Sequence, residues 1–304
     1  MLFISKLLKK LVIQLIQFIQ GHENRIKKIE YVRGLYRYPN KMLGRKFQTN
    51  NLNYSSTDVL VFAAHPDDDI LGLSTTLYRH SLNEDNIKVI FVTNGSGRNG
   101  ESWYTRLSDA KKKSEIRFRE AVQALSLINI PEENIYCFGY PDGGTQRYLK
   151  NMTVDILRIV QILNPSRIYV HCIEGGHHDH DMTSFVVRSI CNKIGFSDVF
   201  EWAEYNPIQP LGTKDIKFLP TQSKEDLKEF QIKISEEERN LKRKMLAAHY
   251  SQDVEQFFLQ GEAIRQAKFS QLELELYEHC KLPIRRLSPL VKELNNSIIR
   301  LQKK

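Results

Sequence analysis

The sequence has only four cysteines, Cys137, Cys172, Cys191 and Cys280, and no two of them form a CxxC pair. This spacing excludes a cysteine-rich structural zinc site and does not match a disulfide framework. We therefore expect small buried thiols that stay reduced in a cytosolic protein. The chain also lacks an internal repeat, a low-complexity tract and an uninterrupted apolar run long enough to cross a bilayer.

Acidic residues are scarce at both ends of the chain. Residues 1–50 hold 11 lysines and arginines against two acidic residues, and residues 281–304 hold seven against one. Because the whole chain carries +8, the 230 residues between these ends carry a net charge of −7. Basic ends indicate contact with a polyanion or an anionic membrane face, although a solvated charged surface is the common alternative. Nothing resembles a known nucleic-acid module, so we expect no nucleic-acid partner.

The first twenty residues, MLFISKLLKKLVIQLIQFIQ, place most of their apolar side chains on one helical face and their lysines and glutamines on the other. A signal peptide is disfavoured, because no small-residue cleavage site follows. An interfacial helix on an anionic bilayer fits residues 1–20, and so does a helix docked on the protein's own core or on a partner subunit. A homo-oligomer therefore stays open. We predict that residues 1–56 form this helix and a basic connector.

Continuous apolar runs of strand length begin at residue 58 and alternate with helical stretches. This pattern predicts an α/β fold of Rossmann-like type, with a mostly parallel sheet flanked by helices. In such sheets ligands bind at the carboxyl ends of the strands. The expected strands are 58–65, 88–95, 135–140 and 167–172, and the expected helices are 70–82, 107–128 and 151–163.

The chain from about residue 222 reads as mainly helical. Ser235 followed by Glu238 predicts a capping box at the start of a helix that runs through Ala248. We place the catalytic domain at residues 57–252, followed by a basic helical extension at 253–304 whose role the sequence does not show.

Metal-binding side chains gather at the ends of two predicted strands. The first cluster is His65-Pro66-Asp67-Asp68-Asp69, and the second lies on a glycine-loosened loop, Glu174-Gly175-Gly176-His177-His178-Asp179-His180-Asp181. Crowded carboxylates repel one another unless a cation or protons accompany them. Two histidines and one carboxylate with open positions are typical of a catalytic metal site, and the spare groups supply a base and an acid.

Four blocks resemble the LmbE-like family, also called the PIG-L deacetylase family. They are VLVFAAHPDDDILGLSTTL, RFREAVQALSL, FGYPDGG and GGHHDHDMTS, within residues 58–250, and KRKMLAAHYSQ resembles a fifth, late helix. The resemblance implies a zinc-dependent deacetylase that hydrolyses the N-acetyl group of an N-acetylglucosamine-type substrate. One zinc ion per chain is implied, and iron, manganese or cobalt would also suit such a donor set.

The resemblance also implies roles for individual residues. His65, Asp68 and His180 match the zinc ligands, and Asp67 matches the general base that takes a proton from the attacking water. His177 matches the imidazole that stabilises the oxyanion or protonates the leaving amine, and Asp179 the carboxylate that orients it. Arg117 and Asp142 match sugar-binding positions, although a surface helix charge and a turn residue are the plainer interpretations. His171 and Glu174 lead into the second cluster and line the expected pocket.

One position departs from the family, because Asp69 stands where a glutamate is usual. A metal-dependent amidase acting on a non-sugar N-acyl substrate would use the same donors, so it stays open. A membrane-binding protein with an inactive metal site is the other alternative. The basic N-terminus favours a lipid-linked or envelope-polysaccharide substrate, handled by a cytoplasmic protein at the inner membrane surface.

Overall fold

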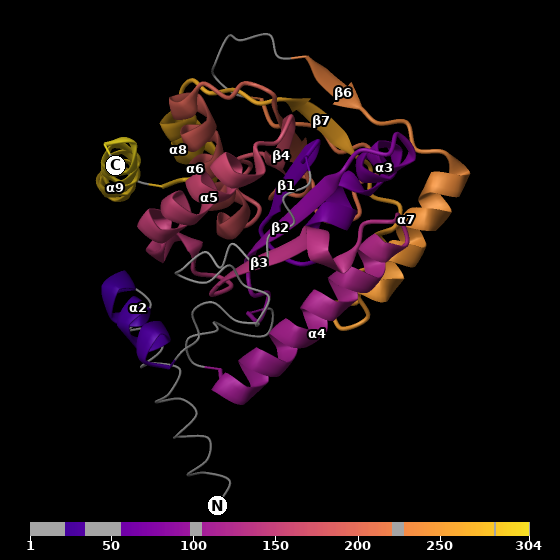
Figure 1. Ribbon diagram of the computed structural model, residues 1–304, viewed down its shortest axis with the longest axis horizontal. Helices are drawn as coiled ribbons and strands as arrows, with labels where there is room; N and C mark the ends of the chain where they lie inside the picture. The colour runs from indigo at the N-terminus through magenta and orange to yellow at the C-terminus, as the bar shows by residue number, and fades with distance from the viewer. Residues whose placement is uncertain (1–21, 34–55, 98–104, 221–227, 283, 304) are drawn as a thin grey trace, which may run out of the picture.

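A seven-stranded sheet forms the centre of the computed structural model (Figure 1), which describes residues 22–33, 56–97, 105–220, 228–282 and 284–303. The predicted amphipathic helix at residues 1–20 lies outside this described part. The strands are β1 (Val59–Ala63), β2 (Ile87–Thr93), β3 (Ile135–Tyr140), β4 (Arg167–His171), β5 (Val199–Ala203), β6 (Glu229–Gln231) and β7 (Ala263–Gln266).

The order of strands across the sheet is β3-β2-β1-β4-β5-β7-β6. The pairs from β3 through β5 are parallel, whereas β7 runs antiparallel to both β5 and β6. The chain adds β2 and β3 on one side of β1 and then crosses back to place β4 on the other side. Open α/β sheets bind ligands in the crevice at such a switch point. The predicted α/β fold with a mostly parallel sheet is confirmed.

Helices cover both faces of the sheet. In Figure 1, α3, α4 and α7 lie on the right, and α5, α6, α8 and α9 lie on the left. The bounds are α2 (Glu23–Val32), α3 (Asp68–Leu82), α4 (Leu107–Ser126), α5 (Leu149–Leu163), α6 (His178–Ile194), α7 (Glu236–Ala248), α8 (Leu272–Cys280) and α9 (Ile284–Gln302), with short 3-10 turns η2 (Glu132–Asn134), η3 (Thr145–Arg147) and η4 (Glu255–Phe257).

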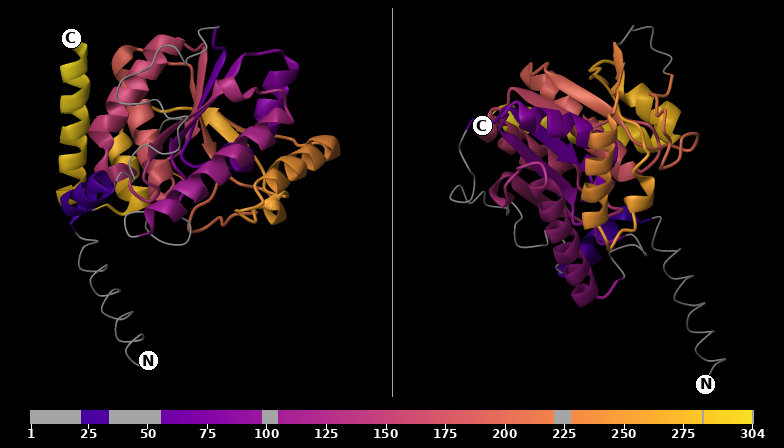
Figure 2. Two further views of the ribbon diagram at one scale, coloured as in Figure 1. Left: turned by 60° about the horizontal axis from the view of Figure 1, so that its bottom comes forward. Right: turned by 90° about the vertical axis from the view of Figure 1, so that its right-hand side faces the viewer.

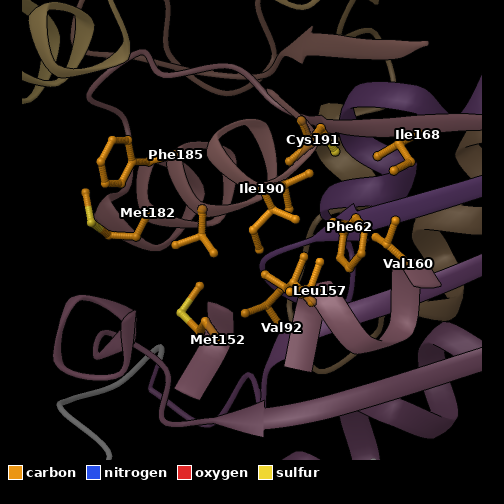
Figure 3. Packing of buried hydrophobic residues seen from close by; sticks show 14 of the residues in the cluster. Phe62, Val92, Met152, Leu157, Val160, Ile168, Met182, Phe185, Ile190 and Cys191 are labelled. Carbon is orange, nitrogen blue, oxygen red and sulfur yellow. The ribbon is translucent and has the colours of Figure 1, made fainter. Parts of the chain in front are cut away.

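Alternate residues of the central strands enter two separate apolar cores. Leu60 and Phe62 of β1 pack beneath α5 and α6, as the close view in Figure 3 shows for Phe62, whereas Val61 and Ala63 pack beneath α3 and α4. All five residues of β1 are buried. Burial on both faces explains why these strands read as continuous apolar runs rather than as alternating ones.

The C-terminal part of the chain differs from the mainly helical prediction. The capping box at Ser235 and Glu238 is confirmed, and α7 follows it to Ala248. The antiparallel strands β6 and β7 also lie in this region, and β7 belongs to the predicted extension 253–304. Strands of three and four residues carry too little apolar pattern to predict from sequence. Among the described residues, no helix is long and apolar enough to cross a membrane.

Gly72 allows α3 to lie directly against β5. A Cβ atom at this position would lie 2.3 Å from Cδ1 and 2.5 Å from Nε1 of the buried Trp202. Alanine normally stabilises a helix interior by about 0.5–1 kcal/mol over glycine, but overpacking a core costs about 1–3 kcal/mol. We therefore expect Gly72→Ala to lower the free energy of unfolding by about 1–2 kcal/mol in denaturant titrations. In a Trp202→Phe background the loss should shrink, and equal losses in both backgrounds would contradict this explanation.

Candidate metal centre and catalytic site

The first cluster lies in a sharp turn between β1 and α3. Asp67 precedes the helix with a φ of 140°, a backbone conformation that side-chain-bearing residues rarely adopt. Arg117 of α4 secures the turn, because its Nη2 donates to Pro66 O at 2.9 Å and to Asp67 Oδ1 at 2.7 Å. Unusual backbone geometry that surrounding contacts maintain is common at functional sites.

The second cluster follows β4 and differs from the glycine-loosened loop expected from the sequence. Helix α6 begins at His178, so Asp179 and His180 lie in its first turn. The glycines permit close packing here, since a Cβ on Gly176 would lie 1.9 Å from Tyr205 O. Rigid packing therefore positions this cluster, and His178 is the first residue of a helix rather than part of a loop.

The three predicted metal ligands converge on one point. His65 Nδ1 lies 3.2 Å from Asp68 Oδ2 and 3.3 Å from His180 Nε2, and His180 Nε2 lies 3.3 Å from Asp68 Oδ2. All three side chains are buried. Two nitrogens and one oxygen thus form a nearly equilateral triangle.

This triangle fits a metal ion. Ligand atoms about 2.0–2.1 Å from a tetrahedral ion lie about 3.3 Å from one another, which is the spacing observed here. His177 also lies within metal-binding distance of His65 and His180. A further group of possible ligands combines Asp68 and His180 with His171 and Glu204. The donors suit zinc and other first-row divalent metals. The described residues therefore form a site that could hold a divalent metal.

Carboxylates around His65 fix the orientation of its ring. Its second nitrogen, Nε2, lies 3.2 Å from Asp142 Oδ1 and 3.3 Å from Asp179 Oδ2. Burial by itself would lower the pKa of His65, but Asp142 and Asp68 outweigh it and raise the pKa well above its usual value. With a metal bound in the triangle, Nδ1 would give up its proton, and a proton on Nε2 facing Asp142 and Asp179 would keep the ring in the usual arrangement of a metal-binding histidine.

Asp67 lies beside the ligand triangle without belonging to it. Burial raises the pKa of this carboxyl group to about 6, against the opposing effect of Arg117. A carboxyl group with a pKa near neutrality is suited to taking up and releasing a proton. The predicted base therefore has a suitable environment. Arg117 is buried and donates a hydrogen bond to this carboxyl group. Its contact with a sugar stays a prediction.

His177 is the most exposed of the predicted catalytic and metal-binding side chains, at 30 %. Its Nδ1 accepts a hydrogen bond from the backbone N–H of Asp179 at 3.2 Å and lies 4.0 Å from the Asp179 carboxylate. Partial burial lowers the pKa of His177 to about 3, and His65 acts in the same direction. This geometry favours a neutral ring with its proton on Nε2.

Asp179 has partners other than the one the resemblance implied. Its carboxylate accepts hydrogen bonds from Gly143 N at 2.7 Å, Thr145 N at 3.0 Å and Thr145 Oγ1 at 2.6 Å. It therefore ties the Pro141-Asp142-Gly143-Gly144 turn to α6. Its predicted effect on His177 stays a prediction.

Asp142 faces the metal ligands from this turn. Its Oδ2 accepts a hydrogen bond from Gly97 N at 2.8 Å, and its Oδ1 faces His65. Burial would raise the pKa of Asp142, but His65 lowers it to about 2. The sugar-binding role of Asp142 stays a prediction. Its contact with His65 gives it a second role, which is to orient the His65 ring.

The sequence did not point to Glu204, and it placed His171 and Glu174 only in the lining of the expected pocket. His171 stacks on His180 with ring centroids 4.0 Å apart, and its Nε2 accepts a hydrogen bond from Ala64 N. Glu204 lies 3.4 Å from His171 Nδ1. Glu174 does not point into a pocket, because its carboxylate binds Glu204 N and Asn206 Nδ2. The positions of His171 and Glu204 at the ends of β4 and β5 were the available signal.

Residues 242–252, the late sequence block, contact the two helices that carry the first cluster and Arg117. Lys242 is buried and donates to Leu71 O of α3 at 2.8 Å. Ser251 donates through its backbone N and its hydroxyl to Glu120, which lies one turn beyond Arg117 on α4. These contacts explain why an R-x-x-E helix and a K…H-x-SQ segment occur together in one sequence.

The fold and the donor set define a doubly wound α/β protein with a site that could hold a divalent metal. The family model described as PIG-L, GlcNAc-PI de-N-acetylase, matches residues 60–191. The matched part of the chain contains both ligand clusters, and the resemblance seen in the motifs is confirmed.

Solved structures show the same fold at low sequence identity. A deacetylase of teicoplanin biosynthesis is 17% identical, with a TM-score of 0.54, over 69% of this chain and 97% of the other. The N,N'-diacetylchitobiose deacetylase from Pyrococcus horikoshii is 20% identical, with a TM-score of 0.52, over 78% of this chain and 92% of its own. An A40926 pseudoaglycone deacetylase is 18% identical, with a TM-score of 0.51, over 65% and 83%. No curated protein sequence matches the chain.

Proposed function

We propose that this protein is a metal-dependent deacetylase that hydrolyses the N-acetyl amide of an N-acetylglucosamine-type sugar. The observation that carries the proposal is the triangle of His65, Asp68 and His180, with Asp67 on one side and His177 at the exposed edge. The family description and the names of the three similar structures agree with sugar-type N-acetyl substrates. Zinc is the proposed metal.

A metal held by His65, Asp68 and His180 would polarise the acetyl carbonyl and make water more acidic. The chain's own groups handle the protons. Asp67 accepts the proton of the attacking water, while Arg117 fixes Oδ1 of its carboxylate from behind. The same proton can then pass from Asp67 to the departing amine nitrogen, so that acetate and a free amine leave the site.

His177 supplies the remaining polar contact. Because its Nδ1 accepts the Asp179 N–H, the proton of the neutral ring is on Nε2, which can donate to the carbonyl oxygen as negative charge develops there. The oxyanion role that the resemblance implied for His177 does not require a protonated ring. A neutral donor provides the same hydrogen bond without placing a further charge beside His65 and His180.

The substrate class can be tested by acetate release from a panel of N-acetylglucosamine, its oligomers and lipid-linked forms, against N-acyl amino acids. We expect release from the sugars and little from the amino acids. The opposite preference would assign the site to the alternative amidase.

The lipid-linked substrate, the inner-membrane location and the role of residues 1–20 rest on the basic N-terminus. Deletion of residues 1–20 tests them through membrane partition.

A further inference from the structure

Lysine and arginine side chains of the described structure gather where α2, the start of α5 and α9 lie near one another. We call this surface the basic face and define it by Lys27, Lys28, Lys150, Lys292 and Arg300. Four of these five side chains are exposed, and Lys27 is half-buried.

The basic face is hollowed in two places. A depression of about 560 Å³ is lined by Lys27, Lys28 and Tyr31, and one of about 400 Å³ is lined by Lys150, Lys292 and Arg300. The only acidic side chain that lines either depression, among the described residues, is Glu293. Three cations around one hollow suit a phosphate group.

The two depressions belong to one continuous surface. Lys27 on α2 interacts electrostatically with Lys150 on α5 and with Glu293 on α9. Its ammonium group also lies 4.9 Å from the ring centre of Tyr148, two residues before Lys150. Figure 2 shows α2 beside one end of α9, in agreement with these contacts.

Apolar side chains stand next to the cations. Tyr31 is 62% exposed and Val32 is 83% exposed, and both line the same depression as Lys28. An aromatic ring, an aliphatic side chain and lysines together are typical of a surface that lies in the interface of a bilayer.

Buried ion pairing joins the basic face to the catalytic site. Glu30 on α2 is fully buried, and it accepts hydrogen bonds from Arg147 Nη2 at 2.6 Å and from Tyr148 Oη at 2.7 Å. Arg147 follows directly on the Asp142–Gly144 turn and Thr145, which Asp179 holds against α6. A membrane docked on α2 would therefore be connected to the turn that carries Asp142 through the buried pair of Glu30 and Arg147.

We propose that the basic face binds the surface of an anionic phospholipid bilayer, with lipid phosphates entering the hollow between Lys150, Lys292 and Arg300. Its net positive charge complements anionic headgroups, and Tyr31 and Val32 provide shallow apolar contact. The inference stands on described residues outside residues 1–20, and it does not depend on the proposed deacetylase activity.

The test uses the full chain and cosedimentation with vesicles of phosphatidylglycerol and phosphatidylcholine. Each lysine near an anionic membrane strengthens binding by about fivefold, so the triple variant Lys28→Gln, Lys150→Gln and Lys292→Gln should bind on the order of 100-fold more weakly. The matched control replaces three exposed lysines elsewhere, Lys112→Gln, Lys214→Gln and Lys244→Gln, and should bind with near wild-type affinity.

Equal losses in the two triple variants, or no loss in either, would overturn the proposal. Binding to soluble polyphosphate without binding to the vesicles would overturn the bilayer as the occupant. Acetate release from a soluble N-acetyl sugar should be the same in both triple variants, because neither changes the site. Loss of membrane binding can therefore be recognised separately from a failure of the deacetylase proposal.

Discussion

Replacing Asp67 with asparagine should lower kcat by about 10²–10⁴-fold while the bound metal stays at its wild-type content. Asparagine has nearly the same shape, so the turn before α3 and the contact with Arg117 can persist. The amide cannot accept the proton of water, however. The ligand atoms of His65, Asp68 and His180 are left in place, which separates proton transfer from metal binding.

The neighbouring carboxyl group provides the control. Asp69 is fully buried, and burial together with the charges of Asp68 and Asp67 raises its pKa well above the usual value. Asp69→Asn keeps the size of a buried side chain that makes no hydrogen bond among the described residues, so it should keep kcat within a few-fold. Steady-state acetate release and metal analysis of both variants give the answer. Full activity of Asp67→Asn would show that another group is the base.

Replacing His180 with alanine should lower metal affinity by well over 100-fold and remove activity with it. Loss of a residue that merely orients a ligand already costs about 10–100-fold, and His180 is itself a ligand in this account. The remaining donors, His65 and Asp68, would leave one corner of the triangle without a donor atom. Metal content after dialysis, followed by titration with zinc, measures the change.

His178 offers a matched control for this substitution, because it lies two residues away on the same helix. Its side chain is half exposed, stacks on His177, and belongs to none of the possible metal-binding groups among the described residues. His178→Ala should bind metal as the wild type does. Retention of metal by His180→Ala, or its loss from His178→Ala, would show that the ligand set is wrong.

The parallel half of the fold could be predicted because its signals are strong. The strands β1 to β4 are buried on both faces, so each gives an apolar run of five to seven residues next to a helical stretch. The strands β5, β6 and β7 were not predicted. β5 contains Glu201, whose charge is buried against Arg188 and Arg265, and such tertiary ion pairs are invisible in a single sequence.

The metal ligands could be predicted because their residue types are rare in combination and the fold brings strand ends together. The roles of supporting residues could not be predicted, since these depend on direction. Arg117 points at Asp67, and Asp179 points at the Gly143 and Thr145 amides, and neither direction follows from position in a motif. The glycines at 175 and 176 likewise signalled a loop, although they serve close packing.

The substitution of the family's usual glutamate by Asp69 also finds a structural explanation. Asp69 is buried on α3 and makes no side-chain hydrogen bond within the described part of the chain, and the triangle of ligand atoms forms without it. The shorter side chain therefore leaves the donor set unchanged.

The central claim is that metal held by His65, Asp68 and His180 supports amide hydrolysis assisted by Asp67. Acetate release from N-acetylglucosamine oligomers, measured before and after metal removal and again after zinc is restored, tests it most directly. We expect acetate release to disappear with the metal and to return with about one equivalent of zinc per chain. In Asp67→Asn, release should stay absent at every zinc level. Release that persists without metal, or that survives in Asp67→Asn, would contradict it.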